Sequence, residues 1–184
     1  MLSVALVHYP CVNREGKVVT TAVTNFDIHD IARAGRTYGI DHYFLVTPVE
    51  LQQQFARRIV DHWTEGWGAD YNPSRGEALA NIEIVGDLAA AGDAIERARG
   101  RQPYWVATSA RRYPHGITCE ALRERIGREP VCLIFGTGYG LHPELIELAD
   151  AILEPIEGPQ PWNHLSVRSA VSIYLDRLLG RGGG

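Results

Sequence analysis

The sequence contains a single lysine, Lys17, although lysine and arginine together number 18. Cysteine is scarce too: Cys11, Cys119 and Cys132 are scattered, so they predict neither a disulfide framework nor a paired metal site. No apolar run approaches the roughly 20 residues of a membrane span. The opening MLSVALVHYP lacks the basic start and the small-residue cleavage site of a secretory signal. We therefore expect a reduced, cytoplasmic protein with no membrane association.

The composition is that of a globular protein, with 45% hydrophobic and 22% charged residues among 184. These values exclude a disordered chain, a collagen-like fibre and a coiled coil. A chain of this length can bury about 70% of its unfolded surface in one core. We expect one domain over residues 1–184, with a frayed tail at 180–184.

Arginine supplies nearly all of the positive charge, and it occurs in clusters, although the net charge is −4. A planar guanidinium binds phosphate through two hydrogen bonds and stacks on bases. The clusters therefore indicate either local basic patches or solvated helix faces, and charge alone leaves both open. They are Arg57 with Arg58, Arg97 with Arg99 and Arg101, Arg111 with Arg112, and Arg123 with Arg125 and Arg128.

Short apolar runs alternate with amphipathic stretches, which predicts an α/β fold: a mostly parallel sheet with helices on both faces. A small hairpin is expected within 12–23, and a surface turn over 66–76. In such sheets ligands bind outside the carboxyl ends of the strands, here after Thr108, Phe135 and Glu154. The predicted strands are 2–8, 42–47, 82–85, 104–108, 131–135 and 151–154. The first predicted helix runs from a cap at 24 or 25 to 38, and the others are 49–63, 88–99, 119–127, 143–148 and 165–179.

A glycine-rich loop follows the fifth predicted strand, with glycines at 136, 138 and 140. Glycine lets backbone amides approach a ligand closely, and it also serves tight turns that have only a structural role. A dinucleotide-binding fingerprint needs the spacing G-x-G-x-x-G at the start of a helix. The spacing here is G-x-G-x-G, which argues against a nicotinamide-dependent enzyme.

A stiff loop with three prolines and a glycine occupies residues 154–162 and leads to Asn163, a good N-cap for the last helix. Small residues near the start of that helix (Ser166, Ser169 and Ala170) leave room for a ligand or a second chain. An ordinary capped helix explains the same pattern.

The first predicted helix begins at Thr24 or Asn25 and ends at Gly39. Arg33 and Arg36 lie one turn apart on it, and Asp27 and Asp30 lie near its start, where acidic groups favour the helix dipole. A surface helix with ion pairs is the alternative interpretation.

These three stretches together resemble the SPOUT superfamily of RNA methyltransferases. Arg33 and the pair Tyr38-Gly39 resemble its first motif, residues 133–141 its second and residues 154–170 its third. The segments FGTGYGL and NHLSVRSA are similar to those of a small bacterial SPOUT subfamily, which itself looks related to domains attached to tRNA guanine-N1 methyltransferases. The resemblance implies a deep trefoil knot at the C-terminal end of the α/β fold.

The resemblance also implies a pocket for S-adenosylmethionine, formed by backbone groups of the three loops, and no metal. The cofactor-binding residues expected from it are Thr108, Ser109, Phe135, Gly136, Thr137, Gly138, Leu153, Pro155, Ile156, Gly158, Asn163, Leu165 and Ser166.

The resemblance implies methyl transfer to tRNA or rRNA by a homodimer that forms through the last helix, with one chain's arginine completing the other's site. Arg33 is expected to bind a phosphate or to lower the pKa of a ribose hydroxyl. Asp27, Asp30 and His164 are candidate bases, and Arg168 is a candidate for binding RNA or the cofactor carboxylate.

The acceptor atom stays open between a ribose 2′-oxygen and a base nitrogen. The ribose-methylating branch carries asparagine where this chain has Asp27, and an L-N-V-S run where this chain has Leu165-Ser166-Val167-Arg168. The same two differences motivate an alternative: a dimeric protein that binds S-adenosylmethionine and RNA without catalysis.

Overall fold

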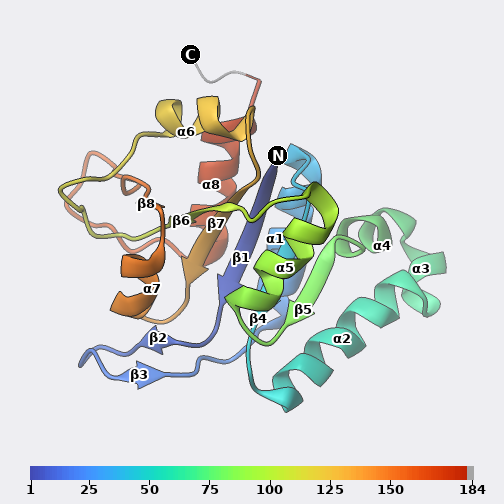
Figure 1. Ribbon diagram of the computed structural model, residues 1–184. Helices are drawn as coiled ribbons and strands as arrows, with labels where there is room; N and C mark the ends of the chain where they lie inside the picture. Colours follow the sequence, from blue (N-terminus) through green and yellow to red (C-terminus); the bar gives the residue numbers. More distant parts are fainter. Residues whose placement is uncertain (182–184) are drawn as a thin grey trace.

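The computed structural model describes residues 1–181, which fold around one six-stranded sheet (Figure 1). The strands run in the order β5-β4-β1-β7-β6-β8, and every pair of neighbours is parallel. The predicted parallel α/β sheet is therefore confirmed. The strands are β1 (Leu2–Val7), β4 (Tyr43–Val46), β5 (Ile82–Val85), β6 (Tyr104–Ala107), β7 (Val131–Gly136) and β8 (Ala151–Ile152).

Helices cover both faces of this sheet, as predicted. Five pack on one face: α1 (Asn25–Tyr38), α2 (Glu50–Thr64), α4 (Pro73–Leu79), α6 (Cys119–Ile126) and α8 (Val167–Leu179). The other face carries α5 (Leu88–Arg99) and α7 (Pro143–Leu148). The predicted hairpin is present as β2 (Cys11–Val12) and β3 (Val18–Val19), and it lies beyond the carboxyl edge of the sheet in Figure 1.

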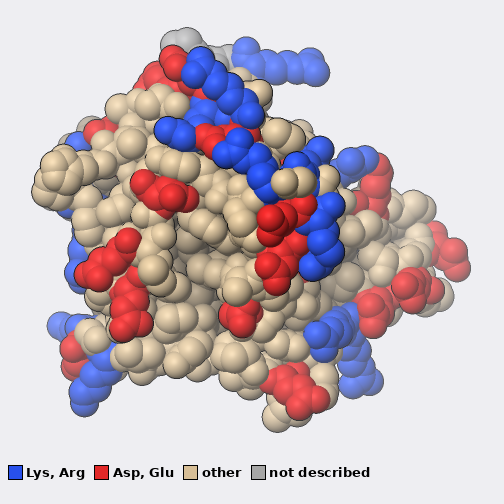
Figure 2. All heavy atoms as spheres, in the orientation of Figure 1, with Lys and Arg blue, Asp and Glu red and all other residues tan. Residues whose placement is uncertain are grey.

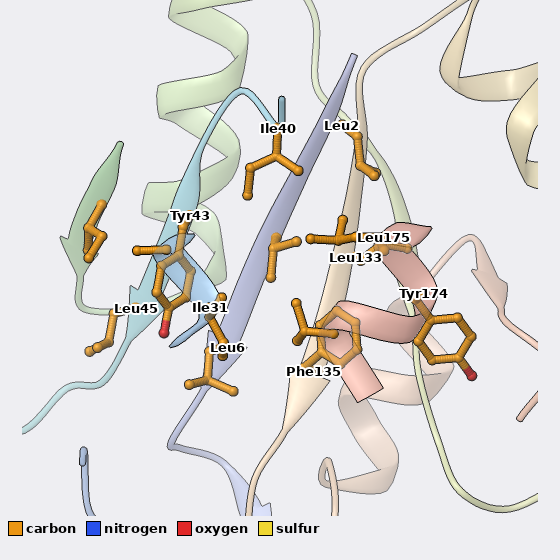
Figure 3. Close-up of a cluster of buried hydrophobic side chains, with 14 of the residues drawn as sticks. Leu2, Leu6, Ile31, Ile40, Tyr43, Leu45, Leu133, Phe135, Tyr174 and Leu175 are labelled. Carbon is orange, nitrogen blue, oxygen red and sulfur yellow. The ribbon is translucent and has the colours of Figure 1, made fainter. Parts of the chain in front are cut away.

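The two central strands, β1 and β7, are apolar except for Ser3, because both of their faces are covered. In β7, Leu133 and Phe135 belong to the core under α1 and α8, whereas Cys132 and Ile134 belong to the core under α5 and α7. Figure 3 shows Phe135 beside Tyr174 of α8, and their ring centroids are 6.0 Å apart.

Strand β7 lies between β1 and β6, although it follows β6 in the chain. It pairs with β1 along its whole length, from Leu2 opposite Val131 to Val7 opposite Gly136, and with all of β6 on its other side. The first and last thirds of the sequence therefore share the centre of the sheet.

The end of β8 is enclosed by the segment that follows β6. The Leu153 amide donates to the carbonyl of Ala107 at the end of β6 (2.9 Å). On the other side, the Ile117 amide donates to Ile152 (2.8 Å) and the Glu154 amide donates to Ile117 (2.9 Å). The loop between β6 and α6 consequently passes around β8.

The surface turn predicted over 66–76 is wrong, because this segment forms two short helices, α3 (Trp67–Tyr71) and α4. Asn72 caps α4 by accepting from the Arg75 amide, and Pro73 starts it. The glycines fit close packing on α2: a Cβ on Gly68 would lie 2.7 Å from the Trp63 ring, and one on Gly76 would lie 2.4 Å from the Trp63 carbonyl oxygen.

The last helix also differs from the prediction. It begins at Val167 and is capped by Ser166, whose side chain accepts from the Ser169 amide, whereas Asn163 does not cap it. Its apolar stripe, including Val171 and Leu175, is buried within the chain, so that stripe offers no surface to a second copy. In the expected tail, the Gly180 amide still bonds to Asp176, and residues 182–184 lie outside the described residues.

Replacing Leu133 by alanine tests the central position of β7. Leu133 is fully buried, so Leu133→Ala is expected to lower the free energy of unfolding by about 2–5 kcal/mol. Leu51→Ala is the control, because Leu51 on α2 is 75% exposed and its loss leaves no cavity. Chemical denaturation measures both variants, and equal stability losses would contradict the described core.

Candidate functional site

The carboxyl ends of β7, β6 and β8 lie side by side, which brings together the three loops that the sequence singled out. Asn163 donates from Nδ2 to the Ala110 carbonyl (3.0 Å), so the loop after β8 touches the loop after β6. Arg112 reinforces this contact, with ion pairs to Glu157 (2.7 Å) and Glu154 (3.5 Å). The three predicted cofactor loops thus form one surface at this edge.

The residues that follow β6 and β8 divide into a buried floor and an accessible rim. Thr108 is buried, and its hydroxyl donates to the Ile134 carbonyl (2.9 Å). Leu153 and Pro155 are buried too, while Gly158 is exposed and a Cβ there would have no neighbour within 4 Å. Ser109 accepts from the Arg111 amide (3.0 Å), which shapes the turn after Thr108.

The glycine-rich loop packs against the β2–β3 hairpin. Gly138 has φ +64°, and a Cβ there would lie 3.2 Å from Thr21 and 3.3 Å from the Val12 carbonyl oxygen. The Tyr139 amide donates to Val12 (3.1 Å), and the Val12 amide donates to Gly140 (3.0 Å). The glycines at 138 and 140 therefore serve the turn and its contact with the hairpin.

Two side chains expected to bind the cofactor point into the scaffold. Phe135 lies in the core against Tyr174. The Thr137 hydroxyl donates to the Val7 carbonyl (3.0 Å) and contacts the Thr21 hydroxyl. At these two positions only backbone groups remain to meet a ligand.

The starts of α1 and α8 converge on a charged cluster next to this edge. The Arg168 guanidinium lies 3.6 Å from a carboxylate oxygen of Asp27 and 3.5 Å from one of Asp30, and 5.3 Å from the Phe26 ring centroid. Asp27 is buried, and it also accepts from the Thr24 hydroxyl at 2.5 Å. The Asp30 side chain is 48% exposed, so of the two carboxylates Asp30 is the one that a ligand can reach.

A polar hollow of about 510 Å³ lies over this cluster, and Asp30, Arg168, Ser169 and Ile173 line it. Among the residues expected to bind the cofactor, Ser166 lines the hollow as well. The hydroxyls and the Arg168 guanidinium there can donate hydrogen bonds to a ligand, while the Asp30 carboxylate, which already pairs with Arg168, can accept them.

The remaining catalytic candidates lie farther out. Arg33 is exposed on α1, and no carboxylate of residues 1–181 lies within ion-pair distance of it, whereas Arg36 pairs with Glu77 of α4. Burial, followed by the charge of Arg75, lowers the pKa of His29; the charge of Asp30 opposes this shift and that of Arg33 adds to it. His164 packs edge-on against Trp162 in the exposed loop before α8.

His8 was missed in the sequence, where it only closed an apolar run. Its ring is fully buried at the end of β1, with Nδ1 3.1 Å from the Thr21 hydroxyl and Nε2 without a partner among the described residues. Burial lowers its pKa to about 4, although the nearby Asp27 charge opposes this shift. His8 is therefore neutral at pH 7 and links β1 to the hairpin that supports the glycine-rich loop.

Comparison with known proteins defines the class. The family described as SAM-dependent RNA methyltransferase matches residues 1–180. An uncharacterised protein of Aquifex aeolicus is 41% identical over 180 residues, which are 97% of this chain and 88% of that protein. The chain belongs to this family of S-adenosylmethionine-dependent RNA methyltransferases. This membership confirms the predicted family, and it does not favour the non-catalytic alternative.

A curated relative from Nitratidesulfovibrio vulgaris is named tRNA (guanine-N(1)-)-methyltransferase, with 46% identity over 176 residues. The match covers 96% of this chain and 41% of the relative, so the chain spans less than half of that protein. Among solved structures, TrmJ from Z. mobilis superposes with a TM-score of 0.62 at 19% identity, covering 99% of this chain and 69% of that one. This likeness confirms the predicted SPOUT-like α/β fold.

Neither a metal-binding group nor a membrane-spanning helix is found in the part of the chain that the structure describes. No group of three or more His, Cys, Asp or Glu residues could hold a metal ion there. Within the same residues, no helix combines the length and apolar character needed to cross a membrane.

Because His8 is buried, we expect the free energy of unfolding to decrease as the pH falls below 7. The folded-state pKa of about 4 lies below the ordinary 6.5, so the unfolded chain binds the proton first as the pH falls. His8 should therefore cost about 2 kcal/mol of stability between pH 7 and pH 4.5. Denaturant unfolding at both pH values should show this loss reduced in His8→Asn, and an identical pH dependence in the two proteins would contradict it.

Proposed function

We propose that this chain transfers a methyl group from S-adenosylmethionine to a ribose 2′-oxygen or a base nitrogen of tRNA or rRNA. The observation that carries this proposal is the meeting of three loops at the carboxyl ends of β7, β6 and β8, beside the charged starts of α1 and α8. The name of the N. vulgaris relative supports tRNA as the substrate. A cytoplasmic location follows from such a substrate.

The residues at this edge fit the cofactor. Leu153, Pro155 and Ile156 form an apolar floor, and the exposed backbone around Gly158 supplies polar groups. Arg168 and Ser166 can donate hydrogen bonds to the carboxylate of the cofactor. When bound, the cofactor supplies an activated methyl group on a sulfonium. The task left to the chain is to position the acceptor and to take its proton.

Asp30 is the stronger candidate for the base, because its carboxylate is half exposed and, among residues 1–181, its ion-pair partner is Arg168. Asp27 is held by Thr24 and Arg168 in a buried position, which makes it a positioning residue. Arg33 is exposed and has no carboxylate partner among residues 1–181, so it is available to bind a phosphate of the RNA or to stabilise charge on the acceptor.

A trefoil knot completes this proposal. It is supported by the position of β8, which is enclosed between β6 and Ile117. The chain that leaves β8 then continues through the stiff loop to α8. Such a closure restrains the loops after β6 and β8 relative to each other, so backbone groups are held in place before the cofactor arrives.

A homodimer is the second part of the proposal, with residues 1–180 as one methyltransferase unit per chain. Its support is an exposed apolar group next to the start of α8: Phe26 is 65% exposed, Trp162 75% and Leu165 46%. Small residues on α8, Ser166 and Ser169, permit close approach of a second chain. In such a dimer Arg33 of one chain would reach the other chain's cofactor loops.

Cofactor binding tests the proposed loops directly. Calorimetric titration with S-adenosylhomocysteine is expected to show micromolar binding that Gly158→Trp abolishes, because an indole at this open position fills the loop. Gly127→Trp is the control at the C-cap of α6, on the opposite edge of the sheet. Equal binding by wild type and Gly158→Trp would contradict the assigned loop.

Arg33 and Arg36 form a matched pair for catalysis. Arg33→Ala is expected to lower the rate of methyl transfer from labelled S-adenosylmethionine to bulk tRNA by about 100-fold, because charge stabilisation at the acceptor is lost. Arg36→Ala should change the rate less than about threefold, since its guanidinium is engaged with Glu77. If both variants lost a comparable part of the methyl-transfer rate, the effect would come from surface charge in general, and the specific role of Arg33 would be contradicted.

Mixing two inactive variants separates a shared site from a site within one chain. If Arg33 acts across a dimer, mixed dimers of Arg33→Ala and Gly158→Trp contain one intact site and recover activity. Absence of recovery in a mixture shown to exchange subunits would contradict the action of Arg33 across the dimer and leave the cofactor loop as it stands.

A further inference from the structure

Apart from Arg111 and Arg112, which join the loops after β6 and β8, the arginine clusters of the sequence have no part in the site described above. Two of them meet at the amino edge of the sheet, on the side opposite the cofactor loops. Figure 2 shows positive surface gathered over α6 and the adjacent end of α5. Four residues form what we call the arginine ridge: Arg97 and Arg99 in the last turn of α5, Arg101 just after it, and Arg125 in the last turn of α6.

The acidic partners of the ridge lie beneath it. Arg101 and Arg125 both pair with Glu129 (2.7 and 2.5 Å), whose side chain is 15% exposed, while theirs are 58% and 44% exposed. Arg99 likewise pairs with Asp41, which is the less exposed partner. The carboxylates are therefore sheltered, and the guanidinium groups face the solvent.

The ridge also carries positive charge without a matching carboxylate. Glu129 serves two guanidinium groups, and Arg97 has no carboxylate partner within 4 Å anywhere in residues 1–181. Arg125 is further held by the Tyr104 ring, 3.9 Å from its centroid, so its position is fixed in advance. Compensation of the helix dipoles explains cations at the ends of α5 and α6, but Arg101 lies outside both helices.

We infer that the arginine ridge binds the phosphate backbone of the RNA substrate, at a distance from the methyl-transfer site. This inference rests on the proposed function. Arginine matches phosphate with two parallel hydrogen bonds, and a row of guanidinium groups from separate segments can follow successive phosphates. Phosphate contacts hold and orient RNA without reading its sequence, so the ridge adds affinity while the carboxyl edge selects the acceptor.

The test is the salt dependence of RNA binding. Affinity for unfractionated bacterial tRNA is measured over a range of KCl concentrations for wild type and for Arg97→Gln with Arg101→Gln. Each lost phosphate contact should lower the slope of log affinity against log salt by about one, so the double variant should lose about two. S-adenosylhomocysteine binding should be unchanged, and in methyl transfer KM should rise while kcat is kept.

Two controls make the result specific. Arg57→Gln with Arg58→Gln removes the same charge from α2 and should leave the slope unchanged, whereas Arg97→Lys with Arg101→Lys keeps the charge and should retain most of it. An unchanged slope in the ridge variant, or an equal loss in the α2 variant, would overturn the ridge alone. Wild-type protein that binds neither tRNA nor ribosomal RNA would overturn the proposed function itself.

Discussion

Strand β7 pairs with β1 on one side and with β6 on the other, and this arrangement positions the remaining elements. It places a strand from the last third of the chain at the centre of a sheet begun by the first residues. The carboxyl end of β7 then lies between those of β1 and β6, which seats the glycine-rich loop on the hairpin after β1. Phe135 on the same strand packs against Tyr174, so β7 also positions α8.

The charged cluster follows from that placement. With α8 packed beside α1, the first turn of each helix reaches the other, and Arg168 meets Asp27 and Asp30. A cation in the first turn of a helix is disfavoured by the helix dipole, and the two carboxylates offset that cost. The chemistry proposed for the site thus depends on residues that lie far apart in the sequence and are brought together by the central strands.

Periodicity predicted the sheet, the two helical faces and the carboxyl-edge loops, because buried strands and amphipathic helices leave a local signal. It misjudged 66–76, where Gly68 and Gly76 mark close helix packing that a turn-rich composition conceals. The expected cap Asn163 was wrong for a similar reason: a contact with Ala110, distant in sequence, holds that side chain. Neither the pairing of Arg168 with Asp27 nor the buried environment of His8 is legible locally, since both arise only when distant elements meet.

The site proposed for S-adenosylmethionine lies between the loops after β6, β7 and β8. A crystal structure with S-adenosylhomocysteine is the decisive measurement. We expect density between the loops that begin at Thr108, Thr137 and Leu153, with the amino-acid end of the ligand toward Ser166 and Arg168. A ligand bound instead in the apolar groove between α5 and α7, lined by Trp105 and Leu145, would contradict it.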